Sequence, residues 1–358
     1  YELWRHVDGH SFCNSWYYNV NKITPENTKK MIMRILYILI FIFMPQVHAD
    51  SGYSKNEVRK FINFMHTEHN YDKKILNTLF SEIKPEKRIK KYIKKAPERT
   101  LLWNGCDEKN KNCTNYKKLF VTKNNITRGL EYWRNNKDAL NKAEKKYGIP
   151  PEIIISIIGI ESKYGSRTGS FKTFDTLASL SLGPNKGRRA KFYRSELVNF
   201  LLLCRENALN PRLIKGSYAG ALGKPQFISS SYRHYAVDFN NDDKVDLWSS
   251  NDDVIGSVAN YFNKHGWRTN QPVLSEISEG AENILLNESK KSYKPTTEYK
   301  KYQKKGIEAL NMIQPNEKLS LIARNEPDDK VFSFAHKNFY VITRYNRSRL
   351  YALAVHFL

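Results

Sequence analysis

The sequence contains few cysteines, four in 358 residues, and their spacing matches no zinc-binding pattern. Cys106 and Cys113 flank the polar loop 107–112, where an exported protein can form a disulfide. Cys204 follows a run of leucines, which predicts a thiol buried in the core and not a nucleophile. No cysteine follows the apolar run 35–44, so we expect no lipid-attachment site.

Long apolar runs are also missing. The run from Ile35 to Met44 is too short to cross a bilayer comfortably as a helix. A basic start after Met31 precedes it and a small residue, Ala49, follows it, which is the pattern of a signal peptide. We expect cleavage after about Ala49, with an uncleaved anchor as the alternative. Residues 1–30 then belong to untranslated sequence or to an over-extended reading frame.

Acidic residues are scarce relative to basic ones. The chain has 36 Asp and Glu against 59 Lys and Arg, a formal net charge of +23, and Lys87–Lys95 is its most basic run. Such a surface favours polyanionic partners. Export argues against nucleic acid and leaves an anionic membrane face or a cell-wall polymer with carboxylates. A genomic bias toward Lys, Asn and Ile would give the same charge without any function, and both interpretations stay open.

The most informative segment is 150–165, which predicts a buried helix with a carboxylate near its end. Two prolines suit a helix start, and Gly165 can end the helix. Ile154, Ile157, Ile158 and Glu161 follow the spacing of one helix face. Burial raises a carboxyl pKa, so Glu161 could hold a proton near neutral pH and act as a general acid. The alternative is a structural salt bridge.

Two further segments are candidates for binding. Gly216–Phe227 is dense in glycine, so its backbone can approach a ligand while Ser217 and Gln226 supply hydrogen bonds. A tight turn between helices is the alternative there. Asp238, Asn240 and Asp242 stand where an EF-hand loop places its first oxygen ligands, with the Lys244 carbonyl next and Asp253 as a closing carboxylate. Position 6 of that loop is Asp243 and position 12 is Ser249, so an ordinary Asx turn is the alternative.

The remaining sequence predicts several regions of different character. Residues 50–145 look helical and basic, with one helix expected from Leu130 to Tyr147 and closed by Gly148. Residues 146–270 carry the candidate chemistry, and 271–335 suggest a small β-containing module. Residues 336–358 are apolar and aromatic again, so we expect them to return to the core. We find neither a phosphate-binding glycine loop nor an internal repeat.

Several of these motifs, taken together in order, resemble the lytic murein transglycosylases of the B type, glycoside hydrolase family 103. The resemblance covers about 115–270 and 335–358, and it is carried by Ile160–Gly165, Gly216–Phe227, Tyr232–Asp238, Asp246–Trp248, Gly256–Phe262, His265–Trp267 and Ile342–Asn346. It implies an α+β fold, mainly α, with a lysozyme-like core, a helical N-terminal domain and a small β-containing domain.

The resemblance also implies a function and a set of site residues. The family cleaves the β-1,4 bond between N-acetylmuramic acid and N-acetylglucosamine without water, leaving 1,6-anhydro ends. Its catalytic glutamate falls on Glu161. Its substrate-binding residues fall on Tyr116, Arg188, Arg189, Ser217, Gln226, Tyr261, Tyr345, Asn346 and Tyr351. An EF-hand-like site for structural calcium is implied as well, while no cofactor is needed for the chemistry.

An ordinary glycosidase needs two carboxylates, and the sequence offers one convincing candidate. One carboxylate is enough for this chemistry, because the substrate supplies its own nucleophile. We expect a periplasmic monomer that acts on peptidoglycan strands, with cell-wall enzyme complexes as possible partners. A non-catalytic peptidoglycan-binding scaffold and a hydrolytic muramidase are the alternatives.

Overall fold

The computed structural model describes residues 53–358 except 87, 90–100, 105–112, 184–186 and 327–328. The predicted signal peptide, Cys106 and most of the basic run Lys87–Lys95 lie outside these residues. Residues 52–358 belong to one unit. None of the helices in the described part is long and apolar enough to cross a membrane.

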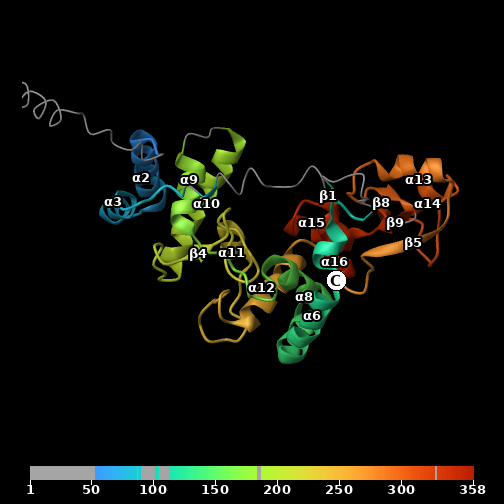
Figure 1. Cartoon of the computed structure of the whole chain (residues 1–358). Helices are drawn as coiled ribbons and strands as arrows, with labels where there is room; N and C mark the ends of the chain where they lie inside the picture. The colour runs from blue at the N-terminus through green and yellow to red at the C-terminus, as the bar shows by residue number, and fades with distance from the viewer. Residues whose placement is uncertain (1–52, 87, 90–100, 105–112, 184–186, 327–328) are drawn as a thin grey trace, which may run out of the picture. The chain divides into compact units, whose positions relative to one another are not determined.

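The chain is mainly helical, with a β-sheet close to its C-terminal end (Figure 1), so the predicted α+β class is confirmed. The N-terminal part contains α2 (Lys55–His69), α3 (Lys73–Ser81), β1 (Leu101–Leu102), β2 (Thr114–Asn115), α5 (Tyr116–Phe120), α6 (Lys123–Asn135) and α7 (Lys137–Tyr147). The middle contains α8 (Pro151–Ser162), β3 (Phe171–Lys172), α9 (Thr173–Leu182), α10 (Arg188–Glu206), β4 (Lys215–Gly216), α11 (Ser229–Tyr235) and α12 (Asn251–Lys264). The C-terminal part contains β5 (Leu274–Glu279), α13 (Glu282–Ser289), β6 (Thr297–Glu298), α14 (Tyr299–Gln303), β7 (Glu308–Ala309), β8 (Lys318–Asn325), β9 (Lys330–Ala335), α15 (Lys337–Tyr345) and α16 (Arg349–Phe357).

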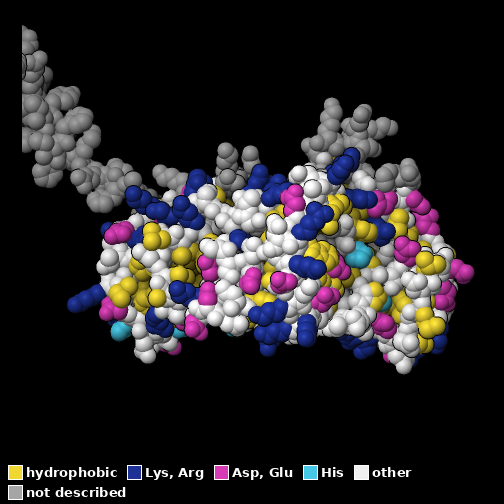
Figure 2. All heavy atoms as spheres, turned by 90° about the horizontal axis from the view of Figure 1, so that it is seen from below, with side chains coloured by type: hydrophobic (Ala, Val, Ile, Leu, Met, Phe, Trp, Pro, Cys, Tyr) yellow, Lys and Arg dark blue, Asp and Glu magenta, His cyan; other side chains and the backbone are white. Residues whose placement is uncertain are grey.

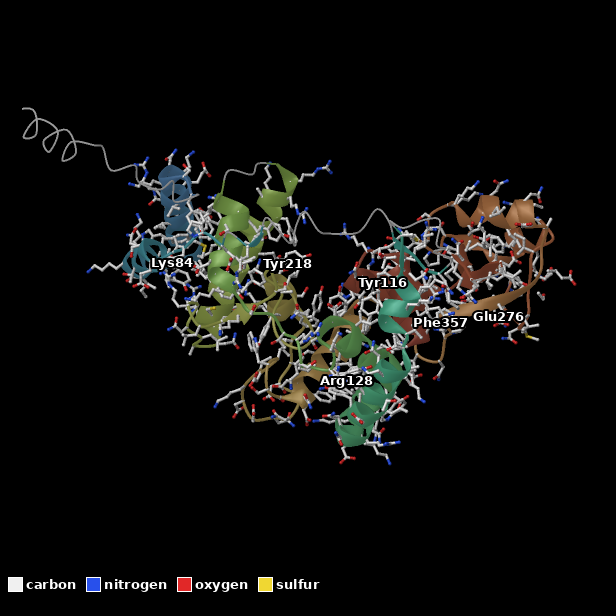
Figure 3. All side chains as sticks on the ribbon, viewed as in Figure 1. Lys84, Tyr116, Arg128, Tyr218, Glu276 and Phe357 are labelled. Atoms are coloured by element: carbon white, nitrogen blue, oxygen red, sulfur yellow. The ribbon has the colours of Figure 1, made fainter. Side chains whose placement is uncertain are left out.

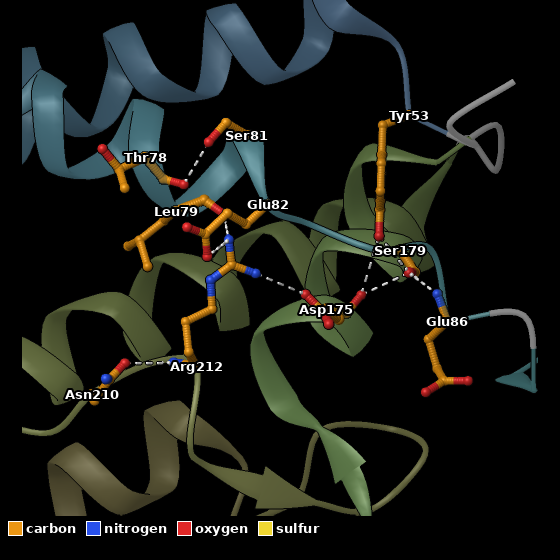
Figure 4. A network of polar contacts seen from close by, with 10 residues as sticks. All are labelled: Tyr53, Thr78, Leu79, Ser81, Glu82, Glu86, Asp175, Ser179, Asn210 and Arg212. Atoms are coloured by element: carbon orange, nitrogen blue, oxygen red, sulfur yellow. Dashed lines mark hydrogen bonds and ion pairs between the residues drawn. The ribbon is translucent and has the colours of Figure 1, made fainter. Parts of the chain in front are cut away.

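Polar contacts join the N-terminal helices to α9 (Figure 4). The Arg212 guanidinium donates to the Leu79 carbonyl in α3, and it lies 3.5 Å from an Asp175 carboxylate oxygen in α9. The Tyr53 hydroxyl, just before α2, lies 2.9 Å from the Ser179 hydroxyl in α9. Burial raises the pKa of the Asp175 carboxyl, and the nearby Arg212 charge opposes that rise. Arg212 therefore partners a carboxylate that would be costly to bury alone.

Residues 130–147 do not form the single helix that their pattern predicts. α6 ends at Asn135 and α7 begins at Lys137, with Asn136 between them. The Asn136 side-chain amide donates to the Tyr132 carbonyl at 2.7 Å, so it closes the last turn of α6. Asn competes with the helical hydrogen-bond ladder in this way, which explains the break. The predicted end at Gly148 is confirmed, because this residue caps α7 in the left-handed conformation.

The segment 271–335 holds an antiparallel sheet with strand order β6-β8-β9-β5-β7. β8 and β9 pair over the longest register, from Ser320 opposite Ala335 to Asn325 opposite Lys330. This sheet has an apolar cluster of its own, separate from the main helical core: Leu285, Tyr299, Tyr302, Ile307, Ile313, Leu319, Leu321 and Phe334. A β-containing module is therefore present, while the exact domain limits stay a prediction.

Two predictions about cysteine have different outcomes. Cys204 is buried, and burial raises the pKa of its thiol to about 12, so it is an inert core residue. Cys113 is disulfide-bonded, whereas Cys106, its predicted partner, lies outside the described residues.

Basic side chains are spread along the molecular face that Figure 2 shows, with acidic side chains among them. On that face they do not gather into one continuous patch. The positive charge visible there is therefore distributed, as a compositional bias would produce.

Candidate active site

Glu161 lies in the last turn of α8, which forms as its sequence predicts. A proline stands at the first helical position, and Ile154, Ile157 and Ile158 are fully buried. The predicted end at Gly165 is wrong, because α8 ends at Ser162 and Lys163 caps it with φ 50°. A non-glycine residue in the left-handed region is uncommon, and its N–H closes the helix by bonding to the Gly159 carbonyl at 3.0 Å.

Tyr164 holds the turn after Glu161 in place, a role that the sequence analysis missed. Its hydroxyl donates to the Asn125 carbonyl at 2.7 Å, and the Arg128 guanidinium lies over its ring at 5.4 Å. A Cβ added at Gly159 would lie 2.7 Å from this ring. The glycine in an otherwise isoleucine-rich helix was the available signal, since such a glycine often marks close packing.

The Glu161 side chain is half-buried and has one strong hydrogen-bond partner. The Tyr351 hydroxyl on α16 donates to its carboxylate at 2.7 Å. Burial raises the pKa of Glu161 to about 7, and the Tyr351 hydrogen bond, which favours the ionised form, opposes that rise. Glu161 is therefore protonated in a substantial fraction of molecules at neutral pH, which a general acid requires.

Three tyrosines from three helices lie close enough to Glu161 for its charge to raise their pKa values. Tyr116 begins α5, Tyr345 ends α15, and Tyr351 lies in α16 with its ring stacked on Tyr345 at a centroid distance of 6.4 Å. Burial raises the pKa of Tyr116 to about 12, and the negative charge of Glu161 adds to this. The same two causes raise the pKa values of Tyr345 and Tyr351 well above the usual range. All three phenols therefore keep their protons and can donate hydrogen bonds.

Tyr345 also connects Glu161's surroundings to the glycine-rich segment. Its hydroxyl donates to the Pro225 carbonyl at 2.6 Å, and its ring packs on Phe227 at 5.8 Å. Tyr261 lies against Tyr345 at a centroid distance of 4.9 Å and is itself buried. The Tyr261 hydroxyl donates to the Arg344 carbonyl, so Tyr261 stabilises the end of α15 that carries Tyr345.

Ser217 lies in a turn whose backbone N–H groups orient its hydroxyl. The Ser217 oxygen accepts backbone N–H groups from Ala219 at 3.3 Å and Ala221 at 3.0 Å. Gly216, which precedes it, has no room for a side chain, since an added Cβ would lie 2.3 Å from the Ala221 carbonyl oxygen. In the described part of the chain, no acceptor takes the Ser217 hydroxyl proton, so this O–H can serve a ligand.

Gln226 is held in an unusual backbone conformation. Its φ is 53°, and its side-chain amide donates to the carbonyls of Thr168 and Gly223 at 3.1 and 2.9 Å. Such strain in a non-glycine residue is typical of functional sites. Both amide protons are used, so the Gln226 side chain can offer a ligand its carbonyl oxygen.

Three predicted site residues are not brought into this cluster. Arg188 and Arg189 are exposed in the first turn of α10, and Asn346 is exposed at the end of α15. None of the three side chains has a contact with Glu161 among the described residues. Their predicted substrate contacts therefore stay predictions.

The predicted calcium loop has the backbone of a tight, multiply bonded turn. The Asp238 carboxylate accepts N–H groups from Asn241, Asp242 and Asp243 at 2.7, 3.2 and 2.9 Å. Asp243 takes φ 63°, the left-handed conformation that an EF-hand loop usually assigns to glycine. Aspartate tolerates this region, so replacing the glycine does not prevent the turn.

Asp253, the predicted closing carboxylate of the loop, lies inside the protein. It is fully buried, and its two carboxylate oxygens accept the N–H groups of Phe239 and Asp246, both at 2.8 Å. Within the described ranges, no three His, Cys, Asp or Glu side chains group closely enough to hold a metal ion. The predicted side-chain donors that are not fully buried are Asp238, Asn240 and Asp242, and together with the Lys244 carbonyl they form a set suited at most to weak calcium binding.

The arrangement around Glu161 suits acid–base chemistry by one group. Burial raises its pKa against the opposing effect of the Tyr351 hydrogen bond, and no other described carboxylate contributes to that rise. A two-carboxylate glycosidase places its second carboxylate within about 5 to 10 Å of the first. Among the described residues, Glu161 has instead a neutral phenol, Tyr351, as its hydrogen-bond partner.

Comparisons with known proteins agree with this geometry. Residues 54–358 match the family described as the transglycosylase SLT domain. The chain is 35% identical over 310 residues to membrane-bound lytic murein transglycosylase B of Escherichia coli (strain K12), covering 87% of this chain and 83% of that protein.

Solved structures match over a similar extent. The soluble lytic transglycosylase SltB1 from Pseudomonas aeruginosa is 36% identical, with a TM-score of 0.76, over 84% of this chain and 96% of that one. The Escherichia coli lytic transglycosylase Slt35 in complex with calcium is 32% identical, with a TM-score of 0.72, over 87% of this chain and 96% of that one. The chain therefore belongs to the lytic transglycosylase family that the SLT domain defines.

Proposed function

We propose that this protein is a lytic murein transglycosylase that cleaves peptidoglycan between N-acetylmuramic acid and N-acetylglucosamine and leaves 1,6-anhydro ends. The observation that carries the proposal is Glu161, a carboxyl whose pKa burial raises to about 7 without a contribution from any other carboxylate in the described part of the chain. One group that can give and then take a proton is enough when the substrate supplies its own nucleophile.

The reaction proceeds in two proton transfers. Glu161 gives its proton to the glycosidic oxygen as the bond to C1 of the muramic residue breaks. The N-acetyl group of that sugar stabilises the oxocarbenium-like centre. Glu161, now a carboxylate, takes the proton of the sugar's 6-hydroxyl, whose oxygen attacks C1. Both reacting groups lie on one sugar, so the second step has the advantage of intramolecular geometry.

Neighbouring side chains orient the substrate. The Ser217 hydroxyl, held by the N–H groups of Ala219 and Ala221, donates to the N-acetyl group or to Glu161. The Gln226 carbonyl oxygen accepts from the glycan. Tyr116 lies close enough to Glu161 for the Glu161 charge to raise its pKa, so it can contact the sugar that Glu161 protonates. Arg188, Arg189 and Asn346 contact more distant parts of the strand.

Mass spectrometry of digested cell-wall sacculi tests this function. We expect muramic ends that carry the 1,6-anhydro ring. Reducing ends would instead identify a hydrolytic muramidase, and tight binding without any product would identify a scaffold. The retained Glu161, its raised pKa and the Ser217 hydroxyl support the first outcome.

We place this activity in the periplasm, where peptidoglycan lies. The signal-peptide pattern at 31–49 and the likeness to a membrane-bound murein enzyme of Escherichia coli support this location.

Replacing Tyr351 with Phe should shift the pH profile of the enzyme upward. The Tyr351 hydroxyl stabilises ionised Glu161, so its removal raises the pKa of this carboxyl above about 7. The protonated acid then persists to higher pH, and the alkaline limb of kcat/KM moves in that direction by about one unit. A Tyr340→Phe variant serves as control, because the Tyr340 ring packs on Tyr293 and Arg344 and has no contact with Glu161 among the described residues. A limb that stays in place or moves down would contradict the assignment.

Calcium should raise the melting temperature by only a few degrees. A ligand that binds only the folded state stabilises it by mass action, and the four remaining loop donors bind weakly. Thermal melts in calcium and in a chelator measure this difference. Asp242→Asn keeps an oxygen for the Lys244 N–H and should abolish the calcium effect. Identical melts for the unsubstituted protein would show that the loop is an Asx turn and nothing more.

A further inference from the structure

Glu326, just after β8, receives several hydrogen bonds from a distant segment of the chain. The Trp103 indole N–H donates to one carboxylate oxygen at 3.1 Å. The Asn104 amide and the Lys117 ammonium donate to the other at 3.3 and 2.9 Å. Burial alone would raise the pKa of Glu326, but the hydrogen bonds from Lys117, Asn104 and Trp103 together lower it, so this carboxylate stays ionised.

One route from Glu326 leads to Tyr116. Lys117 follows Tyr116 in the first turn of α5, and its ammonium forms an ion pair with Glu326. The Lys117 backbone N–H also donates to the Trp103 carbonyl at 2.9 Å. The start of α5, which includes Tyr116, is therefore connected both to Glu326 itself and to Trp103, one of its hydrogen-bond donors.

A second route leads to Tyr351. The Trp103 ring packs on Phe357 with their centroids 5.4 Å apart. The Arg324 guanidinium lies 5.2 Å from the centroid of the Phe357 ring, and the Arg324 Nε lies 3.4 Å from a Glu326 oxygen. Phe357 belongs to α16, the helix that presents Tyr351 to Glu161, and α16 is in contact with α5 (Figure 3).

We propose that Glu326 is a positioning residue for catalysis, which holds α5 and α16 so that Tyr116 and Tyr351 face Glu161. The small β-containing module thereby acts on the reaction centre, although none of its residues is placed in that centre. The inference rests on the proposed function, since it needs Glu161 to be the acid. It assigns a role to a carboxylate that the chemistry itself does not use.

The test compares Glu326→Gln with a matched control, Glu308→Gln. The amide keeps the size of Glu326 but places an NH₂ group against N–H donors, which loosens the cluster. Glu308 lies in the same module and accepts from the Tyr299 hydroxyl at 2.8 Å, without contacts to α5 or α16 in the described part of the chain. Lys117→Gln is a milder second variant that removes one donor and leaves the others.

We expect Glu326→Gln to lower kcat about tenfold on purified glycan strands with little change in KM, since small misplacements of catalytic geometry are costly. The alkaline limb of kcat/KM should move upward, as for Tyr351→Phe, because the Tyr351 hydrogen bond is loosened. In a Tyr351→Phe background, the loss from Glu326→Gln should be smaller than in the unsubstituted enzyme. Glu308→Gln should leave kcat, KM and the alkaline limb of kcat/KM unchanged.

A purely structural role would give a different result. Glu326→Gln would then lower only the melting temperature, with kcat and the pH profile unchanged, and the proposal would be overturned. The proposal would also be overturned if Glu326→Gln lowered kcat by the same factor in the Tyr351→Phe background as in the unsubstituted enzyme. If Glu326→Gln does not fold, Lys117→Gln decides by the same criteria. An inactive unsubstituted enzyme would instead refute the proposed function, so the two failures are distinguishable.

Discussion

Glu161→Gln is expected to lower glycan cleavage by about 10² to 10⁴-fold, the range that general acid–base catalysis contributes. The amide is nearly isosteric with the protonated carboxyl and can still accept the Tyr351 hydrogen bond, so the fold should be retained. Release of soluble fragments from sacculi measures the loss. Glu152→Gln is the matched control, because Glu152 is exposed in the first turn of the same helix. Activity of Glu161→Gln within about tenfold of the unsubstituted enzyme, roughly 1.4 kcal/mol of barrier, would exclude Glu161 as the acid.

The same substitution should change the pH dependence of stability. A carboxyl whose pKa is raised from 4.5 to about 7 on folding costs nothing below pH 4.5, where it is protonated in both states. The cost grows as pH rises toward 7 and is constant above that. Glu161→Gln removes it, so the variant should be about 2 kcal/mol more stable at pH 8, a value discounted because the residue is half-buried. Denaturant melts at pH 4 and pH 8 should show equal stabilities at the lower pH only.

Gly169→Ala is expected to destabilise the protein by about 3 kcal/mol and to reduce activity, although it leaves Glu161 untouched. Gly169 has φ 99°, and an added Cβ would lie 2.1 Å from the Gly216 carbonyl oxygen. Backbone strain and overpacking each cost about 1 to 3 kcal/mol. Relief of the clash must move the backbone that carries Ser217, so kcat should fall as well. Denaturant melts and the fragment-release assay measure the two effects.

The Gly187→Ala variant separates the cost of backbone strain from the cost of a steric clash. Gly187 has a similar φ of 95°, but no atom of the described residues lies within 4 Å of its added Cβ. We expect this variant to lose only the strain contribution, about 1 to 2 kcal/mol, and to keep its kcat. Equal losses for the two variants would mean that the contact between Gly169 and Gly216 is not important for the site.

The sequence alone predicts the helix that carries Glu161 well. The isoleucine spacing of 153–158 predicts a buried helix, and the structure buries Ile154, Ile157 and Ile158 completely; Ile153 and Ile155 on its other sides are buried too. The same spacing places Glu161 on the helix face of Ile154, Ile157 and Ile158, from which burial and the raised pKa follow. These features are local, because one helix and its own periodicity determine them.

The surroundings of Glu161 are a different matter. Tyr351 is 190 positions away from Glu161, and no periodicity relates two residues at that distance. Tyr116, Tyr345 and Tyr351 became candidates through the family resemblance, and their geometry came from the fold. The support from Tyr164 and the Glu326 cluster were missed because both depend on tertiary packing.

Errors in element boundaries have local physical causes that the sequence pattern does not register. Asn136 divides the predicted helix 130–147 because its side chain closes α6. Lys163 ends α8 in the left-handed conformation, where glycine would be expected. Asp243 adopts the same conformation in the predicted calcium loop, so the absence of glycine at this position does not prevent the turn.

Digestion of sacculi in heavy-oxygen water tests the central claim most directly, namely that Glu161 alone drives cleavage without water. If the 6-hydroxyl of the sugar is the nucleophile, the released muramic ends carry no heavy oxygen and lack the mass of one water. The unsubstituted enzyme should give only such unlabelled anhydro ends, and Glu161→Gln should give almost none. Labelled reducing ends from the unsubstituted enzyme would contradict the account, because water would then have attacked C1.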